Sequence, residues 1–76
     1  MDIKSELISV IKDYTDVPSG EIDTSLGLKF LGINSYVVLS MISEIENRFN
    51  VSIPDSDLYN FQTLDDIIGY LEKKTV

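Results

Sequence analysis

Apolar residues recur with the period of an α-helix in three separate stretches of this chain, and no stretch alternates as a β-strand would. The first stretch covers residues 2–14, the second runs from about residue 35 to Phe49, and the third follows Thr63. A short helical turn through Asp57, Leu58 and Tyr59 is also expected. The sequence therefore predicts an all-α protein with three main helices and one short helix.

Each main helix is expected to bury one apolar face. In the first helix this face is made of Ile3, Leu7, Val10, Ile11 and Tyr14. In the second it is made of Val38, Met41, Ile42, Ile45 and Phe49. In the third it is made of Leu64, Ile67, Ile68 and Leu71. Asn50 suits the left-handed residue that ends a helix, and Thr63 with Asp66 has capping-box spacing.

Between the first two helices, residues 15–34 lose all periodicity and collect Pro, Gly and Ser. We expect an ordered loop, because apolar residues recur along it and can hold it to the core. These residues are Val17, Ile22, Leu26, Leu28, Phe30 and Leu31. A loop of about 20 residues is uncommon in a compact domain and is usually functional.

The composition excludes several classes of function. Thirteen acidic residues against six basic ones give a net charge of −7, which disfavours binding to nucleic acids and to anionic membranes. No apolar run approaches the length of a membrane span, and no secretory signal opens the chain, so we expect a cytoplasmic protein. The chain has no Cys and no His, hence no thiolate nucleophile and no usual general base. We therefore expect a binding or carrier protein and not an autonomous enzyme.

Three acidic residues, Asp55, Asp57 and Asp66, stand at the first, third and twelfth positions of a hypothetical calcium loop. Asn60 occupies the position that requires Gly, and Asp66 the position that requires a bidentate Glu. We therefore expect no metal site here, and predict that these carboxylates cap helices or face solvent.

The segment that begins the second helix is the most informative part of the chain. Taken alone, Asn34 or Ser35 is a candidate N-cap. The run Leu28-x-x-Leu31-Gly32-Ile33-Asn34-Ser35-Tyr36, however, resembles the L-x-x-L-G-x-D-S-L signature of acyl and peptidyl carrier proteins. Further matches to that family occur at Ile22-Asp23-Thr24-Ser25, Ile45-Glu46, Phe49-Asn50-Val51, Ile53-Pro54-Asp55 and Thr63-Leu64. The resemblance covers essentially the whole chain, which indicates one carrier domain over residues 1–76.

The resemblance implies a small four-helix carrier-protein bundle with a long loop between its first and second helices. It also implies that the Ser35 hydroxyl receives 4′-phosphopantetheine from coenzyme A, through a separate phosphopantetheinyl transferase. The chain has no thiol, and this arm would supply one for thioesters. A phosphodiester at Ser35 would lie at a helix N-terminus, which favours an anion, and Gly32 would let the backbone turn close to the arm.

Two positions depart from the family pattern. Asn34 stands where most members have Asp, and because Asn caps a helix about as well as Asp, only the charge beside the phosphate is lost. Tyr36 stands in place of the usual Leu. The exposed side of the second helix is also less acidic than in typical fatty-acid carriers. These departures favour a specialised discrete carrier, of polyketide, peptide or amino-acid loading type, over the general fatty-acid carrier.

We expect a monomer that is not itself catalytic and that binds acyl- or aminoacyl-loading and transfer enzymes with basic docking patches. The expected docking face consists of Tyr36, Leu39, Ser43 and Glu46, with Ile53 at its edge. Within the family, the alternative is a D-alanyl carrier of a cell-wall pathway. The alternative from another class is an unmodified helical interaction adaptor, in which Ser35 is only a cap.

Overall fold

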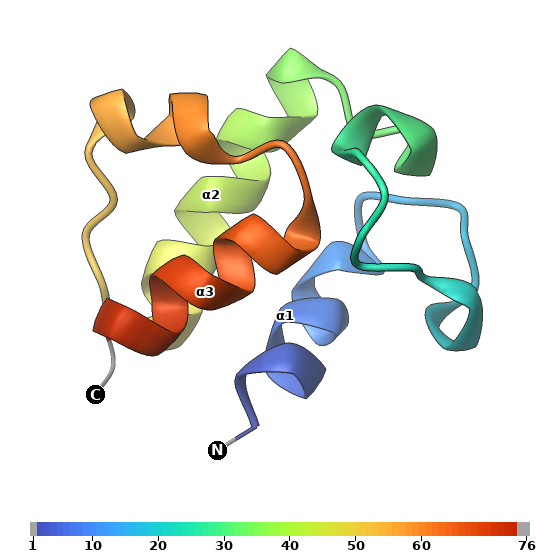
Figure 1. Ribbon diagram of the computed structural model, residues 1–76, viewed down its shortest axis with the longest axis horizontal. Helices are drawn as coiled ribbons and strands as arrows, with labels where there is room; N and C mark the ends of the chain where they lie inside the picture. The colour runs from blue at the N-terminus through green and yellow to red at the C-terminus, as the bar shows by residue number, and fades with distance from the viewer. Residues whose placement is uncertain (1, 75–76) are drawn as a thin grey trace.

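The computed structural model describes residues 2–74, and within them the chain is helical (Figure 1). Its α-helices are α1 (Ile3–Ile11), α2 (Ser35–Phe49) and α3 (Leu64–Lys74). Short 3₁₀ helices lie in the connections, namely η1 (Ser19–Glu21), η2 (Leu28–Leu31) and η3 (Asp55–Asn60). The predicted all-α bundle is thus confirmed over this range. Met1, Thr75 and Val76, the outer limits of the predicted domain, lie outside the described residues.

The helices surround one core. α1 packs against both α2 and α3, and α3 crosses in front of α2 in Figure 1, where the long loop from residue 12 to residue 34 occupies the right of the view. The buried apolar residues are Leu7, Val10, Ile11, Leu28, Leu31, Ile33, Met41, Ile42, Ile45, Phe49, Ile53, Phe61, Leu64, Ile67 and Leu71. No polar residue between residues 2 and 74 is buried, and no helix in this range is long and apolar enough to span a membrane.

The predicted apolar faces of the helices supply most of this core. Four of their members are only partly buried at its edge, namely Ile3, Tyr14, Val38 and Ile68. α1 is shorter than predicted, because it ends at Ile11 and the next residues form turns. The turns carry the Tyr14 hydroxyl to α2, where it donates a hydrogen bond to Glu44 Oε1 at 2.8 Å. This bond raises the pKa of Tyr14.

The helix ends follow the predicted capping chemistry. Asn50 ends α2 in the left-handed conformation, with φ of 55°. At the start of α3, the Asp66 N–H donates to Thr63 Oγ1 at 3.2 Å, and Asp66 Oδ2 accepts from the Thr63 N–H at 3.1 Å. The backbone N–H groups of Gln62 and Thr63 both donate to this carboxylate and lower the pKa of Asp66.

The loop is held to the core by fewer residues than predicted. Leu28, Leu31 and Ile33 are buried, whereas Leu26 and Phe30 are exposed, so the prediction was wrong for these two residues. In the 3₁₀ turn η2, residues three apart lie on the same side. Leu28 and Leu31 therefore face inward together, and Phe30 between them points to solvent. The partly buried residues of the loop include Val17 and Ile22.

A side-chain contact ties η3 to α3. The Tyr70 hydroxyl donates a hydrogen bond to Asp57 Oδ2 at 2.7 Å. The Tyr70 ring meets Phe61 edge to face, with centroids 5.2 Å apart and an interplanar angle of 81°. Burial, and then the bond to Asp57, raise the pKa of Tyr70 to about 12. This contact holds the short helix η3 against the bundle.

Replacing Tyr70 with Phe removes the hydroxyl and keeps the ring. We expect Tyr70→Phe to lower the free energy of unfolding at pH 7 by about 1 kcal/mol, the usual value of such a hydrogen bond. The usual pKa of a Tyr hydroxyl is about 10, so in the unfolded state Tyr70 loses its proton near pH 10. In the folded state the raised pKa keeps this proton on Tyr70 up to a higher pH. The contribution is therefore present below about pH 10 and is lost as the pH rises through 12.

Urea unfolding of the wild type and of Tyr70→Phe at pH 7 and at alkaline pH measures this contribution. The difference between the two proteins should shrink at alkaline pH. Tyr59→Phe is the matched control, since Tyr59 is exposed and makes no hydrogen bond through its side chain among residues 2–74. Equal losses in the two variants would contradict the assigned role of the Tyr70 hydroxyl.

Candidate functional site

The chain is fixed in position just before α2 begins. Gly32 ends η2 in the left-handed conformation, with φ of 77°, which residues with a side chain rarely adopt. The Gly32 N–H donates to the Lys29 carbonyl at 3.1 Å, and the Ile33 N–H donates to the Leu28 carbonyl at 3.2 Å. Because the Ile33 side chain is buried, the backbone reaches Asn34 in a defined position.

Asn34 is the N-cap of α2, one of the two candidates that the sequence left open. Its Oδ1 accepts hydrogen bonds from the N–H groups of Tyr36 and Val37, each at 3.0 Å. Ser35 is therefore the first residue of the helix, and it is exposed. The first turn of α2 holds no acidic residue, whereas those of α1 and α3 do. An exposed hydroxyl thus stands at the positive end of the α2 dipole, with no carboxylate in that turn.

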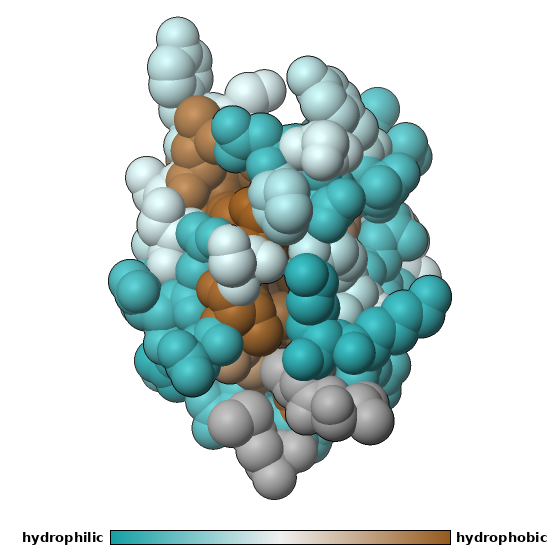
Figure 2. Space-filling view, turned by 90° about the vertical axis from the view of Figure 1, so that its left-hand side faces the viewer, coloured by the Kyte–Doolittle hydropathy of each residue, from teal (hydrophilic) through white to brown (hydrophobic). Residues whose placement is uncertain are grey.

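An apolar groove of about 440 Å³ lies beside this hydroxyl. It is formed by residues of η2, α2 and η3 and of the adjoining segments, namely Leu28, Ile33, Asn34, Ser35, Val38, Leu39, Leu58, Tyr59 and Phe61. Leu39 and Tyr59, with exposed fractions of 58% and 86%, stand at its rim. Apolar side chains also reach the surface on the side of the molecule that carries η3 (Figure 2).

The η3 side of this groove carries no residue that the sequence predicted as part of a site. The available signal was the spacing of Leu58 and Phe61, three residues apart, which places both on one side of a 3₁₀ turn. A six-residue helix is too short for a periodic pattern to reveal its inner face.

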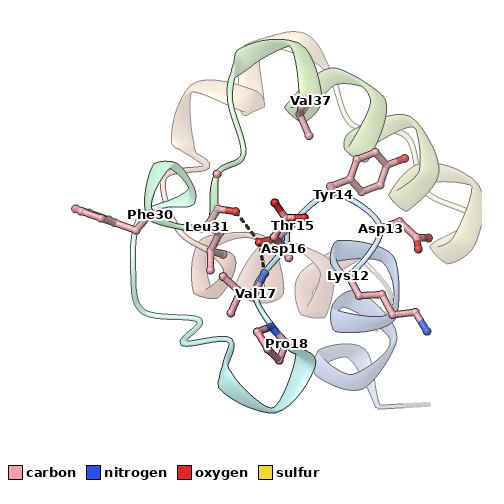
Figure 3. Close-up of a pocket in the computed structure, with 11 residues that line it drawn as sticks. Lys12, Asp13, Tyr14, Thr15, Asp16, Val17, Pro18, Phe30, Leu31 and Val37 are labelled. Carbon is pink, nitrogen blue, oxygen red and sulfur yellow. Dashed lines mark hydrogen bonds between the residues drawn. The ribbon is translucent and has the colours of Figure 1, made fainter.

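A second hollow, of about 790 Å³, lies between residues 12–18 and the segment that leads into α2 (Figure 3). The Thr15 hydroxyl donates to the Leu31 carbonyl at 2.6 Å and accepts from the Val17 N–H at 3.2 Å, which holds the two segments together. Phe30 points away from the molecule in this view. The lining of this hollow does not include Ser35, so we take the groove beside Ser35 as the candidate site.

The residues predicted to form a docking face divide into two groups. Tyr36 is 86% exposed, and Leu39 and Ser43 are also exposed. Glu46 instead turns toward the segment after α2, where its Oε2 accepts a hydrogen bond from the Ile53 N–H at 2.8 Å. The Ile53 side chain is only 5% exposed and belongs to the core. Ile53 therefore offers little surface to a partner, contrary to its predicted place at the edge of this face.

Two of the three acidic residues considered for calcium serve the fold, and the third, Asp55, is exposed. Asp57 accepts the hydrogen bond from Tyr70, and Asp66 caps α3. In the part of the chain that the structure describes, no three residues of the types His, Cys, Asp and Glu lie close enough together to hold a metal ion.

Comparison with known proteins identifies the family. Residues 5–71 match the family described as "Phosphopantetheine attachment site". The acyl carrier protein of Thermotoga maritima is 30% identical over 74 residues, which is 96% of this chain and 91% of the relative. That of Porphyromonas gingivalis is 27% identical over 73 residues, or 95% and 94% of the two chains. That of Phytoplasma australiense is 46% identical over 43 residues, and there the match spans only 57% of either chain.

The helical fold and these matches define the class, a carrier protein with a covalently attached prosthetic group. The chain belongs to the acyl carrier protein family. Its cofactor is covalently attached 4′-phosphopantetheine.

The cap geometry of Asn34 predicts the stability of its variants. We expect Asn34→Ala to lower the free energy of unfolding of the unmodified protein by about 1 kcal/mol, because two helix N–H groups lose their acceptor. Asn34→Asp should stay within about 1 kcal/mol of the wild type, since Asp caps as well as Asn. Thermal melts measure both. Asn47→Ala, within the same helix, is the control and should cost less than Asn34→Ala.

Proposed function

We propose that the Ser35 hydroxyl is the attachment point of the phosphopantetheine arm and that residues 1–76 act as one carrier domain. The observation that carries this proposal is the position of Ser35. Its side chain is exposed in the first turn of α2, and the residue that caps this helix is Asn34 and not Ser35. Ser35 also stands at the serine position of the carrier signature, and it lies within the matched residues 5–71.

The residues at the start of α2 suit a phosphodiester. The helix N-terminus favours an anion, the first turn holds no carboxylate, and Ser35 itself lines the apolar groove. In the attachment step, a bond forms between Ser35 Oγ and the phosphorus atom of coenzyme A that bears the pantetheine. The pyrophosphate bond breaks, adenosine 3′,5′-bisphosphate leaves, and the hydroxyl proton is released. A phosphopantetheinyl transferase catalyses this step, and the carrier supplies the hydroxyl.

When bound, the arm supplies the thiol on which acyl or aminoacyl groups are held as thioesters. The chain's own residues position it: Gly32 makes the tight turn, and Asn34 holds the helix start. We further propose a carrier of polyketide, peptide or amino-acid loading type. The support is the exposed surface of α2 near Ser35, where Tyr36, Leu39 and Ser43 carry no charge.

We propose Tyr36, Leu39 and Ser43 as the contact surface for loading and transfer enzymes. Aromatic and aliphatic side chains supply most of the energy at the centre of an interface. The net charge of −7 acts at longer range and speeds encounter with enzymes that carry basic patches. Carrier contacts must form and break at each transfer, which favours a small interface of this kind.

Incubation with coenzyme A and a promiscuous phosphopantetheinyl transferase tests the attachment point. Intact-mass measurement should show one added phosphopantetheine on the wild type and none on Ser35→Ala. Ser40→Ala, which removes another exposed hydroxyl from the same helix, is the matched control and should be modified as the wild type is. A wild type that stays unmodified with several transferases would favour the interaction adaptor.

A loading assay beside a thermal melt tests the contact surface. Tyr36→Ala and Leu39→Ala should impair acyl loading and largely spare the fold, because both side chains are exposed. The buried Ile42 is the control: Ile42→Ala should lower the free energy of unfolding by about 2–5 kcal/mol. A Tyr36→Ala variant that melts as early as Ile42→Ala would place Tyr36 in the core and remove it from the contact surface.

A further inference from the structure

Only half of the Asn34 carboxamide is used in holding α2. The groups that face it, the N–H groups of Tyr36 and Val37, are both donors, so the atom between them must be the oxygen. The amide nitrogen, with two N–H donors, lies on the other arm of the planar group. It has no acceptor among residues 2–74, and the residue is exposed. Asn34 therefore caps the helix and keeps a free donor on the residue that directly precedes Ser35.

An Asp at this position would cap the helix equally well but would present a charged acceptor in place of that donor. The phosphodiester of the arm carries a negative charge and bears two non-bridging oxygens. An Asp carboxylate next to it would repel it, whereas the Asn amide can donate to it. The first turn of α2 itself holds no acidic residue, so the residue at position 34 decides whether a carboxylate stands beside the phosphate.

We propose that, in the modified protein, the Asn34 Nδ2 amide donates a hydrogen bond to a phosphate oxygen of the arm on Ser35. Asn34 then joins the helix start to the phosphodiester and acts as a positioning residue for the base of the arm. This inference rests on the proposed attachment at Ser35. It assigns a role to the one residue at the attachment point whose charge departs from the signature.

The holo-minus-apo change in melting temperature tests this role through variants that keep the cap. Asn34→Ser caps the helix without an amide donor, and Asn34→Asp caps it with a negative charge. We expect the melting temperature of the holo form, relative to the apo form, to be highest for the wild type, lower for Asn34→Ser and lowest for Asn34→Asp. Raising the salt concentration should reduce the deficit of Asn34→Asp, because salt screens exposed charges. Asn47→Asp adds the same charge further along α2 and should leave the change as in the wild type.

A spectroscopic measurement on the wild type supplies a second readout. In ¹⁵N-labelled protein, the side-chain amide protons of Asn34 should shift downfield between the apo and holo forms, whereas those of Asn47 and Asn50 should not. Intact mass first establishes the modification. A wild type that never accepts the arm overturns both proposals. A modified wild type whose Asn34 amide is unshifted, or an Asn34→Ser variant with the wild-type change in melting temperature, overturns the role of Asn34 alone.

Discussion

The position of Ser35 depends on how the long loop before α2 is anchored. Leu28, Leu31 and Ile33 insert into the core from the last part of this loop. Backbone hydrogen bonds add to this anchor, because the Leu28 N–H donates to the Gln62 carbonyl at 2.9 Å, and the Asp65 N–H donates to the Thr24 carbonyl at 3.0 Å. A loop of about 20 residues would otherwise leave the start of the helix poorly defined. Anchored in this way to the start of α3, it presents the hydroxyl at one place on the bundle.

The acidic residues of α2 illustrate how one helix serves both the fold and the surface. Glu44 accepts from Tyr14 beyond the end of α1, and Glu46 accepts from the backbone of Ile53. Each carboxylate thereby joins α2 to a segment that lies outside the α-helices. The exposed face near Ser35 is left to Tyr36, Leu39 and Ser43, which are neutral.

The two walls of the groove beside Ser35 differ in how tightly they are packed. The wall formed by α2 and η2 contains buried core residues, and the wall formed by η3 is held by fewer contacts. α2 and η2 are bound into the core through Leu28, Ile33 and neighbouring buried residues. The other wall, η3, contains no fully buried residue. Side-chain contacts that hold it include the hydrogen bond from Tyr70 to Asp57. Segments with few buried contacts are those that open at least cost, so this wall is the one most able to adjust.

Local rules within the sequence determined the helices, their caps and the family. The apolar period located α1, α2 and α3, the side-chain chemistry of Asn50 and of Thr63 with Asp66 set helix ends, and the run around Ser35 indicated a carrier. These features depend on residues within a few positions of one another. The short range of such rules is why they can be read without a structure.

Tertiary contacts decided the rest. Residues 15–34 show no hydrophobic period, so the sequence alone does not tell that Leu28 is buried and Phe30 exposed. The 3₁₀ helix η2, with three residues per turn, decides which of these side chains faces the core. The inward turn of Glu46 depends on a backbone N–H seven residues away, and the place of Tyr59 at the groove depends on how η3 meets α2. The sequence alone determined which segments fold and which residue could carry the arm. Only the packing of distant segments determined which side chains remain exposed around it, because burial is a property of the whole assembled core.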